Sequence, residues 1–183
     1  MKPSDIHPGL WLAHVPDIVG KGRPRFSTVN GQARAYTPKA TRDAEEAVKA
    51  ACLATRIRRG GQLRDEGCIL AVVVLDPLGP WATTPKGKPS KKGAQAHAQA
   101  LPAAARPDAD NLLKLAGDGA QGAWFTSDSR VTPWLWRGWA RSPRHVGMWL
   151  GCWEATAPRD VLALLGDAER GPLALARALS GIR

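Results

Sequence analysis

Apolar and polar residues alternate or cluster in a way that predicts four strands and at least two helices. Residues 10–15 predict a first strand, and residues 134–136 and 146–153 alternate in the manner of two later strands. Residues 68–75 are apolar without a break and rich in β-branched side chains. Such a run is typical of a central strand that is buried on both faces.

A helix is predicted to begin near Thr41, which is a plausible N-cap, and to end at Gly60-Gly61. Its inward stripe is expected to consist of Ala44, Val48, Ala51, Cys52 and Thr55. A shorter helix is predicted with Asp110 at its N-cap.

Three segments lack a clear period. Residues 21–26 predict a basic loop whose amides and guanidinium groups could lie along phosphates. Residues 82–105 predict a mobile loop that carries four lysines. The tail from residue 159 to 183 predicts two short helices packed on the domain, or an oligomer contact.

Composition favours a basic globular protein of one domain. The 183 residues carry a formal charge of +10, and 44% are apolar. No run approaches the roughly 18 apolar residues of a membrane span. No secretory signal pattern is present, and the three cysteines are scattered, so a reducing cytosol is the expected compartment.

Acidic residues gather in one part of this basic chain. Residues 106–130 have a net charge of −1, although the whole chain is strongly positive. A basic protein binds polyanions, and an acidic pocket within it repels them unless a divalent cation lies between. The pattern therefore suggests metal-dependent phosphodiester chemistry on nucleic acid.

The acidic residues offer hard oxygen ligands that suit Mg²⁺ or Mn²⁺. Asp108 and Asp110 are expected to project to one side, and Asp128 could arrive beside them. Lys114 and Asp118 follow Asp110 at four-residue steps on one helix face. Spacing alone favours a structural interpretation, in which Asp110 is an N-cap and Asp128 a turn residue.

Other chemistries find no support in the sequence. The chain has no P-loop, HExxH or GxSxG motif, its four histidines are scattered, and nothing indicates a zinc site. Six of the eight tryptophans lie between residues 124 and 153. They could stack on unpaired bases, but at alternating strand positions they are more typical of a core or a dimer surface.

Several short motifs, in order, resemble the RusA-type Holliday junction resolvases. They are Lys21 to Phe26, Tyr36 to Lys39, Arg106 to Lys114 with Asp118, and Gly122 to Val131. The resemblance runs roughly from residue 19 to 153. It implies a small α+β domain, with a mixed sheet and packed helices, that works as a homodimer on four-way DNA junctions in recombination and repair.

The resemblance also implies Mg²⁺-dependent, paired symmetric nicks. Position by position, Asp108, Asp110 and Asp128 match metal-binding catalytic aspartates, Lys114 matches a catalytic lysine, and Asp118 a supporting acid. The basic residues expected to hold DNA are Lys21, Arg23, Arg25, Lys86, Lys88, Lys91 and Lys92. The tail outside the resemblance predicts a domain over residues 1–158 and a helical extension over residues 159–183.

This chain departs from the family pattern at a few positions. Ser127 precedes Asp128 where two acids are common, and Gly117 and Gly119 weaken the short helix, in place of residues that would make it firmer. Gly138 takes the place of a frequent lysine, and Gly20 that of a proline. Two alternatives stay open. One is a non-catalytic DNA-binding or architectural protein, and the other is a nuclease that acts on forks or flaps.

Overall fold

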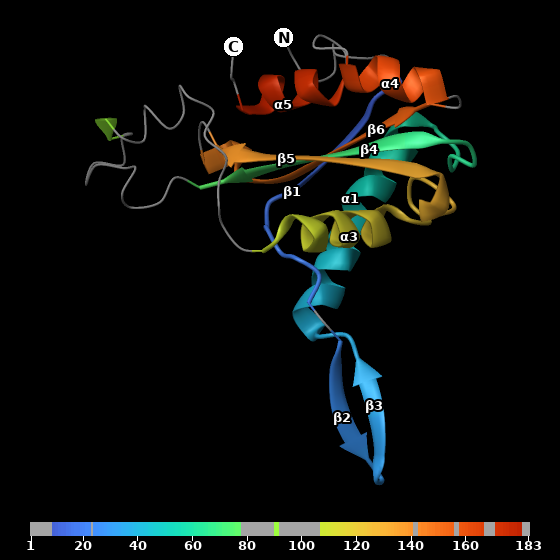
Figure 1. Ribbon diagram of the computed structural model, residues 1–183, viewed down its shortest axis with the longest axis vertical. Helices are drawn as coiled ribbons and strands as arrows, with labels where there is room; N and C mark the ends of the chain where they lie inside the picture. Colours follow the sequence, from blue (N-terminus) through green and yellow to red (C-terminus); the bar gives the residue numbers. More distant parts are fainter. Residues whose placement is uncertain are drawn as a thin grey trace.

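A computed structural model describes residues 9–22, 24–77, 90–91, 107–140, 143–155, 158–166 and 171–180. Its sheet has the strand order β1-β6-β4-β5 (Figure 1), from β1 (Trp11–Val15), β6 (Gly147–Glu154), β4 (Cys68–Asp76) and β5 (Val131–Trp139). β4 and β5 are parallel, and the other pairs are antiparallel. The predicted small mixed sheet with packed helices is confirmed.

Helices cover both faces of this sheet (Figure 1): α1 (Lys39–Arg59) and α3 (Ala109–Ala120) lie on one face, and α4 (Pro158–Gly166) and α5 (Pro172–Ser180) on the other. Alternate residues of β4 enter two cores, with Val72 in the α1–α3 core and Val73 in the α5 core. All nine residues of β4 are buried, as the unbroken apolar run predicted.

The boundaries of α1 confirm its predicted end and correct its predicted start. The helix ends at Gly60, whose φ of 64° places it in the left-handed conformation that glycine adopts at little cost. It begins at Lys39, so Thr41 lies inside the first turn. There the buried Thr41 hydroxyl accepts a hydrogen bond of 3.0 Å from the Gly22 amide, and so ties the segment after β1 to α1.

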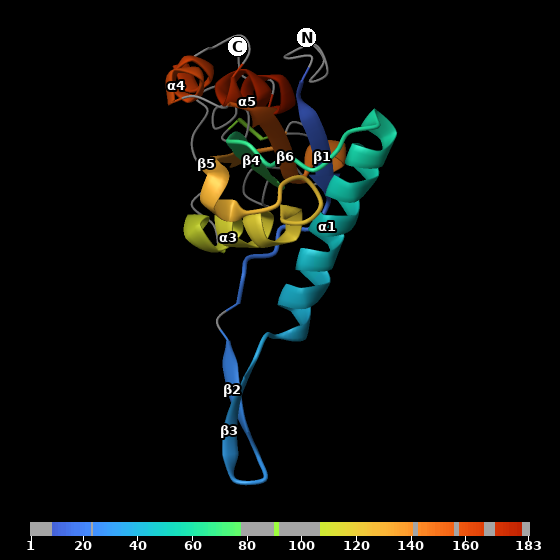
Figure 2. The ribbon, with the colours of Figure 1, turned by 90° about the vertical axis from the view of Figure 1, so that its right-hand side faces the viewer.

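A β-hairpin occupies part of the segment for which the sequence predicted a basic loop. β2 (Arg25–Val29) pairs with β3 (Gln32–Tyr36) through a tight turn at Asn30-Gly31, where φ is 53° and 78°. Asn-Gly between two strands is a strong hairpin signal that the loop interpretation missed. The hairpin projects away from the body of the molecule in both ribbon views (Figures 1 and 2).

The C-terminal residues form the two short helices that the sequence predicted. α5 buries Ala174, Leu175, Ala176 and Leu179 against the sheet. Two tryptophans are part of the hydrophobic cores. Trp124 and Trp153 are fully buried, which favours a packing role over base stacking at these two positions. Among the described residues, no helix is both long and apolar enough to cross a membrane.

Candidate functional site

The two aspartates at the start of α3 are exposed, and neither carboxylate caps the helix with a hydrogen bond. Asp108, not Asp110 as the sequence predicted, occupies the N-cap position, with extended backbone at φ −68° and ψ 156°. Its carboxylate makes no capping hydrogen bond, and Asp110 lies in the first turn. The structural interpretation of Asp110 as an N-cap is therefore wrong, and both carboxylates face solvent.

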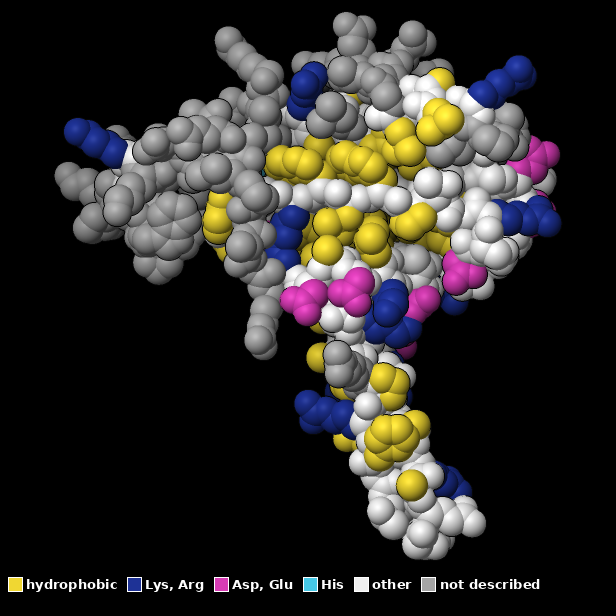
Figure 3. Space-filling model, viewed as in Figure 1, with side chains coloured by type: hydrophobic (Ala, Val, Ile, Leu, Met, Phe, Trp, Pro, Cys, Tyr) yellow, Lys and Arg dark blue, Asp and Glu magenta, His cyan; other side chains and the backbone are white. Residues whose placement is uncertain are grey.

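Lys114, Asp118 and Asp128 line one shallow pocket of about 230 Å³ between α3 and β5. Its apolar wall includes Leu70, Leu113, Phe125, Val131 and Pro133. The Lys114 ammonium lies 3.8 Å from the Asp110 carboxylate, so Asp110 adjoins the pocket through this pair. Figure 3 shows acidic and basic side chains together over α3, below a band of hydrophobic side chains over β5.

Asp128 begins a short 3₁₀ helix that leads into β5. The Ser127 hydroxyl accepts a hydrogen bond of 3.3 Å from the Ser129 amide and caps this turn. Serine thus performs a structural task at the position where the resemblance leads one to expect a second acid. The Asp128 side chain is left exposed at the pocket.

Lys21 is held by two acidic side chains on neighbouring helices. Its ammonium pairs with Asp118 of α3, and lies 3.3 Å from Glu45 of α1. The hydrogen bond to Asp118 raises the pKa of Lys21 above its ordinary value. The Lys21 amide also donates to the Asn111 carbonyl at 3.0 Å, so this segment is fastened to α3 by backbone and side chain. Because its charge is already paired, Lys21 has less to offer a phosphate than an unpaired lysine.

Gly20 explains how the segment approaches α3 so closely. A Cβ at Gly20 would lie 2.3 Å from the Cβ of Pro107, a distance that real side chains do not reach. The ring of Pro107 therefore occupies the space that a side chain at residue 20 would need. Glycine, which stands where the resemblance leads one to expect proline, lets the segment pack directly against the residue before Asp108.

The acidic residues have the right donor atoms for Mg²⁺, although they form no closed cage. Within the described part of the chain, no three His, Cys, Asp or Glu side chains are grouped closely enough to hold a metal ion. Mg²⁺ is usually bound by one or two carboxylates and completes its shell with water and substrate phosphates. Exposed carboxylates such as Asp108, Asp110 and Asp128 fit that mode of binding.

The predicted DNA-binding residues are only partly within the described structure. Arg25 is exposed on the projecting hairpin, and Lys91 is exposed as well. Arg23, Lys86, Lys88 and Lys92 lie outside the described residues. Sequence reasoning did not select Arg34, Phe26 or Tyr36, which are also exposed on the hairpin. The Asn-Gly turn was the signal that could have identified them as one surface.

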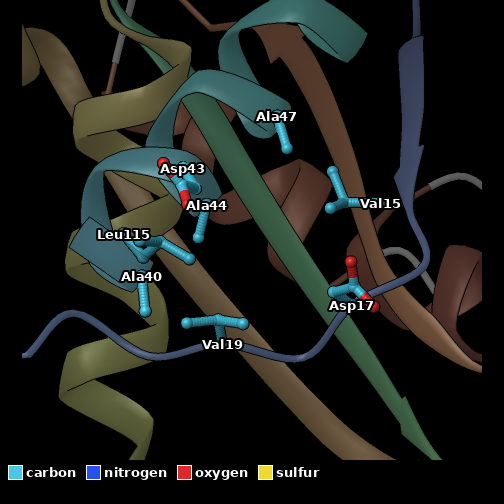
Figure 4. Close-up of a pocket in the computed structure, with 8 residues that line it drawn as sticks. All are labelled: Val15, Asp17, Val19, Ala40, Asp43, Ala44, Ala47 and Leu115. Atoms are coloured by element: carbon cyan, nitrogen blue, oxygen red, sulfur yellow. The ribbon is translucent and has the colours of Figure 1, made fainter.

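A second pocket, of about 130 Å³, lies between the segment after β1 and α1 (Figure 4). Small apolar side chains line most of it, and Asp17 and Asp43 face it from opposite sides. Asp43 is paired with Lys39 at 2.6 Å. None of the four predicted catalytic residues is among its lining residues in the described part of the chain, so this pocket is separate from the α3–β5 pocket.

Comparison with known proteins yields one family. The family model described as endodeoxyribonuclease RusA matches residues 16–146, a range that contains Asp108, Asp110, Lys114 and Asp128. No curated protein and no solved structure shows significant similarity to the chain.

Proposed function

The chain belongs to the RusA endodeoxyribonuclease family, and from that premise we propose that it resolves four-way DNA junctions by paired, symmetric nicks. The observation that carries the proposal is the family match over residues 16–146, which spans every residue of the α3–β5 pocket that has a charged side chain. Junction resolution places the protein in DNA recombination and repair, with a reducing cytosol as the expected location.

In this proposal Asp108, Asp110 and Asp128 would supply the carboxylates for the divalent cation, Mg²⁺ or Mn²⁺, with one or two of them on a given ion and water and phosphate oxygens completing its shell. When bound, the cation would make a water molecule more acidic and neutralise charge at the scissile phosphate. Within the described part of the chain these carboxylates are exposed, so they can accept a cation together with a phosphate. Asp118 would act indirectly, since its pairing with Lys21 holds the segment after β1 against α3.

Lys114 would stabilise the negative charge that develops on the phosphate. Its side chain is exposed and lines the same pocket as Asp128. Asp110 lies one helical turn before it, so the lysine is attracted toward the carboxylate side of the pocket. A positioned cation at the place where charge develops lowers the barrier to phosphoryl chemistry.

DNA would be held mainly through its phosphates. The basic surface that would contact them consists of the β2–β3 hairpin together with lysines outside the described residues. The hairpin contributes Arg25 and Arg34 and carries no acidic residue. A homodimer would place two sites across an open junction, because the dimer and the junction share two-fold symmetry. Paired incision follows from that geometry.

The decisive experiment is cleavage of a mobile synthetic four-way junction with Mg²⁺, run beside Asp110→Asn. Wild type should give paired nicks, and the variant should give none while binding the junction as well or better, because a repulsive charge is removed. The matched control is Asp43→Asn, which changes an aspartate on α1 outside the α3–β5 pocket, and this variant should cleave normally. Cleavage by Asp110→Asn at the wild-type rate would contradict the assignment of Asp110.

Fork and flap substrates of the same sequence separate the remaining alternatives. Preference for forks or flaps would keep the nuclease and change its substrate. Binding with no cleavage of any substrate, under Mg²⁺ and Mn²⁺ alike, would leave a DNA-binding protein without the enzyme.

A further inference from the structure

A buried ion pair connects the ends of β4 and β5 beside the start of α3. Arg137 of β5 donates to both carboxylate oxygens of Asp76, from Nε at 2.6 Å and from Nη2 at 2.8 Å. Both side chains are only 9% exposed. Alternation along the strands explains why they meet: Val74 and Leu135 face the α1–α3 core, so Asp76 and Arg137, each two residues further on, point to the same side.

The arginine in this pair makes a third contact, and that contact reaches the candidate site. Arg137 Nη1 donates a hydrogen bond of 2.6 Å to the carbonyl oxygen of Pro107. The carbonyl carbon of Pro107 is bonded directly to the nitrogen of Asp108. Asp76 orients the guanidinium, and the guanidinium fixes the peptide unit from which Asp108 and α3 begin.

Stability alone does not account for such a pair. Replacing a buried ion pair by apolar side chains of similar volume is often neutral or stabilising, because desolvation of both charges opposes their attraction. A planar guanidinium held at a carboxylate does, however, impose a direction on its remaining N–H groups. A donor oriented in this way can hold the Pro107 carbonyl in one place.

We propose that Arg137 and Asp76 are positioning residues of the cleavage site, which fix the Pro107–Asp108 peptide so that Asp108 and Asp110 present their carboxylates together. This inference rests on the proposed function and adds two residues to it that touch neither DNA nor cation. Packing of Gly20 against Pro107 supports the same peptide from another side.

The test uses the full chain with the double substitution Asp76→Leu and Arg137→Met. It replaces both charged groups by apolar ones, so that neither charge of the pair is left buried without the other, and it removes the hydrogen bond to Pro107. Urea unfolding should show a midpoint near that of wild type. KM for the junction should stay within about twofold, since phosphate contacts on the basic surface set it, while kcat should fall about 10- to 100-fold, as expected for loss of an orienting partner.

Mn²⁺ binding to the protein without DNA gives a readout that is independent of cleavage. Calorimetric titration should show an affinity reduced about 10- to 100-fold in the double variant. Arg137→Lys supplies a second variant: it keeps the charge, but a compact ammonium cannot hold the carboxylate bidentately and still reach the carbonyl. Both kcat and Mn²⁺ affinity should fall in this variant, as in the double variant. It provides the test if the double variant does not fold.

Arg64→Met is the matched control. Arg64 is also a buried arginine, and its Nη2 donates to a backbone carbonyl, that of Gly9, at 2.9 Å. Its loss should lower stability and leave kcat per folded molecule and Mn²⁺ affinity unchanged.

The outcomes separate this inference from the function on which it rests. Wild-type kcat and Mn²⁺ affinity in a folded double variant and in Arg137→Lys would overturn the positioning role alone. A wild-type protein that neither cleaves branched DNA nor binds Mn²⁺ would overturn the proposed function and the positioning role with it.

Discussion

At the scale of single residues, Gly117 and Gly119 lie two positions apart on α3 in opposite surroundings. A Cβ built on Gly119 would lie 2.6 Å from Cβ of Val48, so this glycine is what lets α3 pack closely against α1. A Cβ on Gly117 would meet nothing within 4 Å. α3 continues through both glycines to Ala120, and the weakening that the sequence pattern suggested stays a prediction.

These surroundings predict opposite effects of one substitution. Gly117→Ala should raise the free energy of unfolding by about 1 kcal/mol, because alanine costs less backbone entropy in a helix. Gly119→Ala should lower it by about 1–3 kcal/mol, because the added methyl group overpacks the contact with Val48. Urea unfolding of both variants measures the difference. Equal changes would show that α3 does not pack on α1 as described.

Gly138 is a third glycine whose surroundings limit what can replace it. The ring of Trp136 occupies the space beside it, with its nearest atom 2.2 Å from where a Cβ would lie. A lysine, which the resemblance leads one to expect here, would require the ring of Trp136 to move. The neighbouring residue, Arg137, points inward to Asp76. Its guanidinium places a positive charge near the start of α3 although residue 138 is not a lysine.

At the scale of elements, the β2–β3 hairpin stands apart from both hydrophobic cores. The pairing register places Arg25, Arg34 and Tyr36 on one face and Phe26 on the other. Phe26 is 75% exposed and Tyr36 46%. An isolated two-stranded hairpin is marginally stable in water, so an exposed arm of this kind gains from a partner. Its positive charge and aromatic side chains suit DNA.

Substitution of both hairpin arginines, Arg25→Gln with Arg34→Gln, tests this role. Stability should change by less than about 0.5 kcal/mol, because these are exposed positions. The slope of log K for junction binding against log salt should become shallower by about 2, because two phosphate contacts are lost. Binding measured by fluorescence anisotropy at several salt concentrations gives that slope.

The matched control removes the same charge from the opposite end of α1, with Arg58→Gln and Arg59→Gln (Figure 2). Its slope should stay close to that of wild type. Equal slopes for the two double variants would mean that the hairpin has no special part in holding DNA.

At the scale of the whole molecule, one sheet separates two hydrophobic cores, and helices cover each of its faces. α1 and α3 pack on one face, where α3 carries the candidate site, while α5 covers the other face through Leu175, which is fully buried. The boundary predicted between residues 158 and 159 stays a prediction. Burial of α5 nevertheless indicates that the C-terminal helices contribute to the stability of the sheet that positions the site.

Leu175→Ala should therefore lower the free energy of unfolding by about 2–5 kcal/mol through loss of a buried side chain. Leu162→Ala, on α4, is the control: Leu162 is 72% exposed, and its change should stay within about 0.5 kcal/mol. Thermal unfolding of the two variants decides the matter. A Leu175 variant as stable as wild type would support an independent extension.

The sequence by itself determined the four strands of the main sheet, the long helix, the family and the identity of the candidate residues, because these depend on local periodicity and on short motifs. The unbroken apolar run from residue 68 to 75, rich in β-branched side chains, predicted a strand buried on both faces, and the structure confirms it. The Asn-Gly turn also lay within reach of local reasoning, although the loop interpretation overlooked it.

Only the tertiary structure decided which residues meet across distant segments. Nothing local indicates that Lys21 pairs with Asp118, that Gly20 makes room for Pro107, or that Arg137 joins Asp76 to the peptide before Asp108. These contacts link residues far apart in sequence, and sheet register together with helix packing brings them together. The physical reason is that periodicity fixes the face on which a side chain lies, whereas its partner is fixed by the neighbour that the fold places against that face.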